Sequence, residues 1–95
     1  MREYFVYVVQ CSDKSYYTGI TNNLERRLYE HNKGVNKTAY TFRRRPVTLR
    51  YCEAFKNPLD AITFEKKLKN WSRKKKEALF SNDWESIRKL SLKKR

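Results

Sequence analysis

Glycine, proline, cysteine and histidine are all scarce in this chain of 95 residues, and each scarcity excludes a class of protein. Two glycines and two prolines are too few for a low-complexity or linker-like chain. Two cysteines, Cys11 and Cys52, cannot supply a disulfide framework, and a single histidine cannot complete a zinc site with them. We therefore expect one small domain in a reduced, cytoplasmic compartment.

Long hydrophobic runs are missing as well. The longest run covers residues 4–9, far short of the roughly 20 residues that span a bilayer. Charged residues follow this run too soon for a convincing signal-peptide core, namely Asp13 and Lys14. The sequence therefore predicts no association with a membrane.

Acidic residues are outnumbered: 10 Asp and Glu stand against 23 Lys and Arg, which leaves a net charge of +13. A net charge of this size on a small protein produces a strong positive electrostatic field, which favours a polyanionic partner. We expect this partner to be nucleic acid, above all DNA. A membrane surface is less favoured because the basic residues do not follow one amphipathic helix. The alternative is that the charge only confers solubility. The basic residues cluster, however, and we expect phosphate contacts from Arg43, Arg44, Arg45, Lys66, Lys69, Arg73, Lys74, Lys75 and Lys76.

Apolar patterning predicts three strands. Residues 4–11 are β-branched and aromatic and indicate a buried strand, and residues 16–20 follow a short polar turn as the second. Residues 47–55 alternate and indicate the third. Gly19 inside the second strand marks either a bulge or a close approach to the backbone.

Capping residues predict the helices. The first begins with Asn22 as its N-cap, has Glu25 three residues later and stops at Gly34. The next begins at Asn57 with a proline in its first turn, and another covers residues 73–80. Residues 82–92 form either a last short helix or a fraying tail. The order β-β-α-β-α-α describes one α/β domain over residues 1–95, with a core at about 4–80 and a three-stranded, mainly antiparallel sheet flanked by helices.

Polar residues interrupt two of the apolar helix faces. Arg27 and His31 are four residues apart and share a face that partly points toward the sheet. Glu65 lies within the core-facing stripe of its helix, where a carboxylate is costly unless a cation satisfies it. The alternatives are structural: Arg27 pairs with Glu65, His31 is an interfacial histidine, and Tyr7 and Tyr17 pack across neighbouring strands.

A set of short motifs carries a family resemblance over most of the chain. Phe5-Val6-Tyr7 and Tyr17-Thr18-Gly19 resemble the paired strand motifs of the GIY-YIG nuclease domain. Arg27, His31 and Glu65 stand at the spacing of that family's helical residues, and the segment 71–76 is similar to the ending of its small, stand-alone bacterial members, relatives of the excinuclease catalytic domain. The first motif has Phe-Val in place of Gly-Ile, and the second has Thr in place of Ile.

The resemblance implies a role for each matched residue. Glu65 would hold one Mg²⁺ or Mn²⁺, because a carboxylate oxygen suits a hard cation that keeps most of its waters. Arg27 would contact the scissile phosphate. Tyr7 or Tyr17 would help to activate the attacking water, with His31 orienting or carrying the proton. A late asparagine of the family is matched by Asn82, with Asn70 as the other candidate.

The resulting hypothesis is a metal-dependent endonuclease that hydrolyses DNA phosphodiester bonds. No base-reading module is evident, so the enzyme would select DNA structure or depend on a protein partner, and the relatives suggest DNA repair. The first alternative is a non-catalytic DNA- or RNA-binding module of the same fold, since fold does not guarantee activity. The second is a basic structural protein whose binding depends on net charge alone.

Overall fold

The first strand, β1 (Tyr4–Gln10), is the centre of the molecule, and the computed structural model describes residues 3–92 around it. The sequence ends in a further basic cluster, Lys-Lys-Arg at residues 93–95, which lies outside this range. The elements that follow β1 are β2 (Tyr16–Thr21), α1 (Leu24–Lys33), a short 3-10 turn (Phe42–Arg44), β3 (Thr48–Phe55), α2 (Pro58–Lys69), α3 (Arg73–Phe80) and α4 (Trp84–Leu92).

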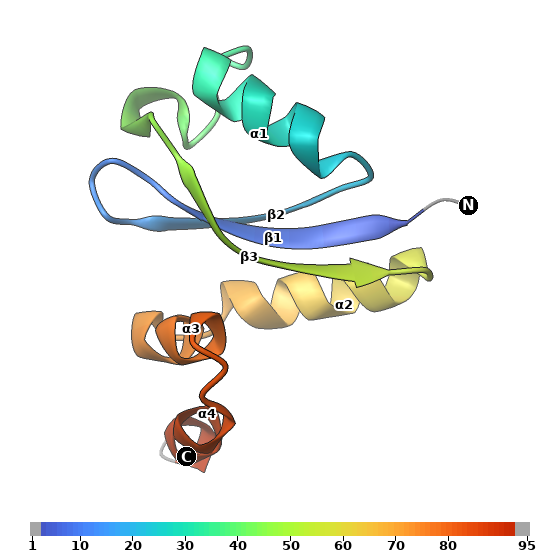
Figure 1. Ribbon diagram of the computed structural model, residues 1–95, viewed down its shortest axis with the longest axis vertical. Coiled ribbons are helices and arrows are strands. Elements are labelled where there is room, and N and C mark those ends of the chain that lie inside the picture. The colour runs from blue at the N-terminus through green and yellow to red at the C-terminus, as the bar shows by residue number, and fades with distance from the viewer. Residues whose placement is uncertain (1–2, 93–95) are drawn as a thin grey trace.

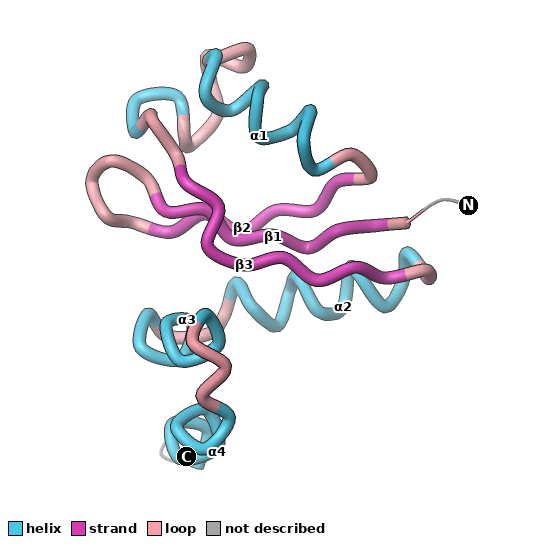
Figure 2. The backbone as a smooth tube through the Cα atoms, in the orientation of Figure 1, coloured by secondary structure: helices cyan, strands magenta, loops and turns pink. Residues whose placement is uncertain are grey.

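The three strands form one antiparallel sheet in the order β2-β1-β3. Figure 2 shows β1 between the other two strands, so that β2 and β3 are both edges. Tyr7 pairs with Gly19 across the sheet, and Val9 pairs with Tyr17. Tyr7 and Tyr17 are therefore diagonal neighbours on one face, which confirms the predicted strands and their antiparallel arrangement.

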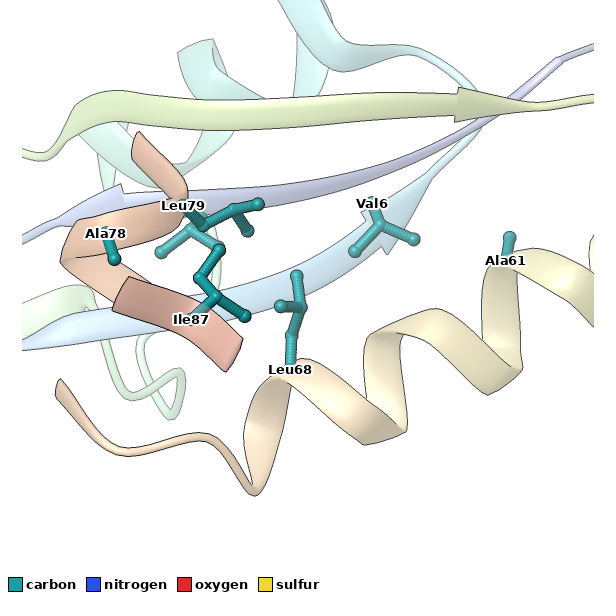
Figure 3. Packing of buried hydrophobic residues seen from close by; sticks show 7 residues of the cluster. Val6, Ala61, Leu68, Ala78, Leu79 and Ile87 are labelled. Carbon is teal, nitrogen blue, oxygen red and sulfur yellow. The ribbon is translucent and has the colours of Figure 1, made fainter. Parts of the chain in front are cut away.

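Helices cover both faces of the sheet. Figure 1 shows α1 on one side and α2 and α3 on the other, with α4 beyond α3. The central strand is thus buried on both faces, which explains why residues 6–9 are apolar without alternation. Val6 and Val8 face α2, where they pack with Ala61, Leu68 and Leu79 (Figure 3), and the α1 side holds a second cluster of Tyr7, Val9, Cys11 and Val47.

Helix ends follow the predicted signals with one correction. The N-cap of α1 is Asn23, whose side chain accepts a hydrogen bond from the backbone N–H of Arg26, so the assignment of this role to Asn22 was wrong. Gly34 ends the helix in the left-handed conformation with φ of 72°. Asn57 caps α2 as predicted, and its side chain accepts from the backbone N–H of Leu59.

The segment at residues 82–92, left open between a helix and a fraying tail, contains the helix α4. It contacts α3, and Ile87 joins the core cluster on that side of the sheet. Within residues 3–92 no helix is both long enough and apolar enough to cross a membrane.

Gly19 marks a close approach of a side chain to the backbone of β2. A β-carbon at this position would lie 2.6 Å from Cζ of Tyr7, so the ring fills the space that a side chain would take. Tyr7 has no exposed surface. The absence of a side chain at Gly19 therefore fixes where the Tyr7 ring lies, and the ring extends across β2 toward the edge of the sheet.

We expect Gly19→Ala to lower the free energy of unfolding by about 1–3 kcal/mol, because the added methyl group overpacks a ring that cannot move into solvent. Urea unfolding followed by circular dichroism measures this loss. Gly34→Asn is the matched control, since asparagine tolerates the left-handed conformation and the neighbouring Arg45 side chain can move. Equal stability of Gly19→Ala and the wild type would show that the Tyr7 ring is not held in this position.

Candidate active site

Tyr7, Tyr17 and His31 form a cluster of three rings between the sheet and α1. The ring centroids of Tyr7 and Tyr17 are 6.4 Å apart, and the His31 ring lies 5.9 Å from Tyr7 and 5.4 Å from Tyr17. Cross-strand packing of the tyrosines is therefore real, but it is not their whole environment. The histidine on α1 contacts both rings, so the two strands and the helix meet at this point.

A hydrogen-bonded chain passes through the imidazole. The Tyr7 hydroxyl oxygen lies 2.9 Å from Nε2 of His31, and Nδ1 of His31 lies 2.8 Å from Oγ1 of Thr41. Thr41 is buried, in the segment that connects α1 to β3. The threonine hydroxyl oxygen can accept a hydrogen bond from Nδ1–H, and Nε2 is then free to accept one from the tyrosine O–H. The arrangement provides a short path for a proton from Tyr7 to His31.

Burial sets the protonation state of both groups. It raises the pKa of Tyr7 to about 12, and the charges of Tyr17 and Glu65 add to this effect while the Arg27 guanidinium opposes it. Burial also lowers the pKa of His31 below its usual 6.5, and the charge of Arg27 acts in the same direction. At neutral pH Tyr7 is therefore protonated and His31 is neutral, so the tyrosine O–H donates the hydrogen bond and Nε2 accepts it.

Arg27 lies beside this chain on α1. Its Nε is 3.4 Å from a carboxylate oxygen of Glu30, one turn further along the helix. Arg27, Glu30 and His31 line a cleft together with Tyr17 of β2 and Thr41. The predicted common face of Arg27 and His31 is thus the wall of an open cleft, and the structural pairing of Arg27 with Glu65 is replaced by the contact with Glu30.

Glu65 approaches the site from α2, on the other face of the sheet. Arg27 of α1 and Ile62 of α2 line one cleft at the edge of β2, so the two helices face each other across this edge. Glu65 lies one turn beyond Ile62, and its charge acts on Tyr7. The side chain of Glu65 is 14% exposed, and its carboxylate is 3.1 Å from Nζ of Lys69.

The donor set at Glu65 limits the kind of metal ion that could bind. Within the described residues no group of three or more His, Cys, Asp and Glu side chains comes together. A single carboxylate fits an ion such as Mg²⁺, which keeps several waters and takes further oxygens from a substrate phosphate. It does not fit an ion that needs a closed cage of protein ligands, such as structural zinc.

The two candidate asparagines have local partners. The Asn82 side chain accepts a hydrogen bond from Nε1 of Trp84 at 3.1 Å, and it follows α3 at a positive φ of 62°. The Asn70 side chain donates to the backbone oxygen of Lys66 at 3.2 Å. Neither asparagine lines the clefts that contain Tyr17 or Arg27.

Several of the predicted phosphate-binding cations have contacts within the protein. Arg44 is 3.1 Å from Asp13 and lies over the Tyr40 ring, while Arg45 lies over Phe42. Arg73 pairs with Glu77 at 3.2 Å. Lys75 is only 8% exposed, so the structure places it in the interior and not on the surface. The exposed members of the set are Arg43, Arg45, Lys66, Lys69, Arg73 and Lys74.

Three residues of the site were missed by the sequence analysis. Thr41 orients His31, Glu30 holds Arg27, and Tyr40 stacks on Tyr17 with ring centroids 6.0 Å apart and planes 19° apart. Thr41 and Tyr40 belong to a polar, basic segment without periodicity. Glu30 could have been found, because it stands three positions after Arg27 on the same helix.

Comparisons with known proteins identify the family to which the motifs belong. Residues 3–78 match the family model described as the GIY-YIG catalytic domain. A UPF0213 protein of Halobacterium salinarum is 49% identical over 75 residues, which cover 79% of this chain and 96% of that protein. A UPF0213 protein of Bacillus pumilus is 45% identical over 74 residues, covering 78% of this chain and 74% of the other.

Two solved structures share the fold. The solution structure of a UPF0213 protein from Bacillus halodurans has a TM-score of 0.55 and 38% identity, covering 83% of each chain. The solution structure of a protein from E. faecalis has a TM-score of 0.61 and 36% identity, covering 86% of each chain. Both the sequence motifs and the arrangement of strands and helices agree with one assignment, and the chain belongs to the GIY-YIG catalytic-domain family.

Proposed function

We propose that this protein is a metal-dependent endonuclease that hydrolyses DNA phosphodiester bonds. The hydrogen bond between Tyr7 and neutral His31 is the observation that carries the proposal, because it provides a proton acceptor beside a guanidinium and near a carboxylate. Membership of the GIY-YIG family supports it. A module that only binds nucleic acid has no need for a proton path of this kind.

Arg27 and Glu65 would act on the phosphate from the two sides of the β2 edge. A guanidinium has five donors, so the contact of Nε with Glu30 leaves donors for phosphate oxygens. Glu65 would hold one Mg²⁺ or Mn²⁺, which would neutralise the charge that develops on the phosphate. The ammonium of Lys69 occupies the carboxylate in the free protein, and this exposed side chain can move aside.

The two tyrosines would have different roles in the reaction. Tyr7 is buried and hydrogen-bonded to His31, so it would pass the proton of the attacking water to the imidazole. Its raised pKa means that the phenolate forms only when positive charge gathers near its oxygen. Tyr17 lines the open cleft and would contact the phosphate or the water directly. Tyr7 depends on Gly19, which gives the Tyr7 hydroxyl its place beside the edge of β2.

Selection among DNA substrates would come from structure or from a partner. No element of the described residues resembles a base-reading module. The basic side chains contact phosphates in any sequence. We therefore propose activity on branched, nicked or otherwise irregular DNA, as in a repair process, or recruitment by a protein partner that supplies the specificity.

Glu65→Gln should reduce magnesium- or manganese-dependent cleavage by at least about 100-fold, because the amide cannot neutralise a cation as the carboxylate does. Cleavage is measured at low salt on branched, nicked, single-stranded and duplex DNA, since the preferred substrate identifies the process. Glu85→Gln is the control, as it removes the same charge from an exposed position on α4.

A second readout separates metal binding from turnover. Manganese broadens the NMR signals of nearby nuclei, and we expect broadening around Glu65 in the wild type and in Glu85→Gln, but not in Glu65→Gln. Salt-sensitive DNA binding without cleavage in any of the three proteins would instead favour the non-catalytic binding module.

Tyr7→Phe and Tyr17→Phe test the division between the tyrosines. We expect Tyr7→Phe to lose about 100-fold or more in cleavage, because it removes the donor to His31. We expect Tyr17→Phe to lose less and to weaken substrate binding as well. Single-turnover rates at saturating enzyme distinguish the two effects. Full activity of both variants would show that no tyrosine takes part in activating the water.

His31 is the only histidine of the chain, so its titration can be followed directly by NMR. We expect a midpoint below 6.5, so that the imidazole stays neutral to a lower pH than it would in an unfolded chain. Arg27→Gln should raise the midpoint, because it removes a cation that opposes protonation. Arg26→Gln removes the same charge from the adjacent residue and should leave the midpoint near its wild-type value. A wild-type midpoint at or above 6.5 would contradict the neutral acceptor.

A further inference from the structure

A second cleft opens on the edge of β2, next to the candidate active site. It has a volume of about 370 Å³ and is lined by Tyr16, Tyr17, Thr18, Tyr40, Lys69 and Lys76. Tyr17 also lines the cleft that contains Arg27 and His31. Lys69 contacts Glu65. The second cleft is therefore continuous with the site through two side chains, yet the proposed hydrolysis uses no residue that is particular to it.

Lys76 has an unusual position for a lysine. Its side chain is half-buried on α3, and burial lowers the pKa of its ammonium group. Among the residues that the structure describes, no carboxylate lies within ion-pair distance of it. Half-buried cations are costly without a partner of opposite charge. An anion that enters the cleft would offset the free-energy cost of desolvating the Lys76 ammonium.

Thr18 supplies a second, independent observation. The residue is 4% exposed, and its hydroxyl oxygen has no hydrogen-bond partner among the described residues. Buried hydroxyl groups are almost always hydrogen-bonded, so an exception calls for a reason. The oxygen is closed off from solvent in the free protein. An anion would reach it after a side chain at the wall of the cleft moves, and Lys69 and Lys76 have the rotamer freedom to do so.

The carboxylates that border the cleft are already neutralised. Glu65 pairs with Lys69, and Glu77 accepts from the Tyr16 hydroxyl at 2.9 Å and pairs with Arg73 at 3.2 Å. Because Lys69 is shared with Glu65, the cleft presents one uncompensated ammonium group, that of Lys76, together with the Thr18 hydroxyl and no uncompensated negative charge among these contacts. An anion with several oxygens, held at more than one point, matches this arrangement better than a single carboxylate does.

We propose that this cleft binds a phosphate of the nucleic-acid backbone that flanks the phosphate to be cleaved. The proposal rests on the proposed function only in that a neighbouring phosphate is cleaved. The cleft can bind a phosphodiester whether or not the protein hydrolyses it. Tyr17 lines both clefts, so a strand that occupies both follows the free edge of β2. The Thr18 hydroxyl and Lys76 then belong to substrate positioning and not to the reaction itself.

Binding is tested without turnover. The probe is the trinucleotide d(TTT), which has internal phosphodiesters and no terminal phosphate, titrated into ¹⁵N-labelled protein with EDTA present. We expect amide shifts at residues 16–18 and on α3, and at least fivefold weaker binding to Lys76→Gln. Lys67→Gln is the matched control, because it removes the same charge from an exposed position on α2, two residues from Lys69. Equal weakening by the two substitutions would overturn the proposal, since general electrostatics would then explain the binding.

Inorganic phosphate is the second probe. If it shifts the same residues while d(TTT) does not, the cleft is a site for a free anion and the proposal is wrong. Shifts with both probes support it, because the diester then enters the site that recognises the phosphate group.

Thr18→Val distinguishes a hydroxyl that binds the ligand from one that only stabilises the fold, because the two roles predict opposite changes in melting temperature. Valine keeps the shape and removes a buried polar group that lacks a partner, so we expect the melting temperature to rise by about 4 °C or more while binding of d(TTT) weakens. A lower melting temperature would overturn the proposal, because it would show that the hydroxyl is bonded within the fold. Tyr51→Phe, on the other edge strand, serves as the control for loss of a hydroxyl outside the cleft.

The two proposals fail separately. If Glu65→Gln cleaves as well as the wild type but Lys76→Gln binds d(TTT) less well, the endonuclease site is wrong and the phosphate subsite stands. If Glu65→Gln is inactive and Lys76→Gln binds like Lys67→Gln, the endonuclease stands and the subsite is wrong.

Discussion

The packing of the Tyr7 ring against Gly19 is the constraint around which the site is built. Because Gly19 has no side chain, a tyrosine from the central strand extends across its neighbour and brings its hydroxyl to the imidazole of His31. The same ring belongs to the apolar cluster beneath α1. One side chain therefore serves both the core and the proton path, so that the helix that packs on the core also delivers the histidine.

Local sequence signals were enough for the strands and most helix ends. Continuous apolar residues indicated a buried strand, and Asn57 and Gly34 marked ends of helices because their side-chain and backbone properties act locally. The choice between Asn22 and Asn23 was missed, since both can cap a helix. It is settled by the Thr21 hydroxyl, which accepts from the backbone N–H of Asn23 at 3.1 Å.

The candidate site was less accessible to sequence reasoning. Helical spacing alone placed Arg27 and His31 on one face and Glu65 in a core-facing stripe, and the family resemblance supplied the tyrosines and the metal-binding role of Glu65. The contact of His31 with Thr41 and the stacking of Tyr40 on Tyr17 depend on how the segment between α1 and β3 folds back, and that segment has no periodicity to read. Charge clustering likewise could not separate Lys75, which is buried, from Lys74, which is exposed.

The ion pair between Glu65 and Lys69 has a consequence for how this protein folds. The glutamate precedes the lysine by four residues on α2, which is the orientation that stabilises a helix. The carboxylate is thus compensated inside its own helix, and residues 3–92 contain no cluster of acidic side chains that an ion must hold together. We therefore expect folding to be independent of metal supply, so that chelators that unfold zinc-dependent domains leave this architecture intact.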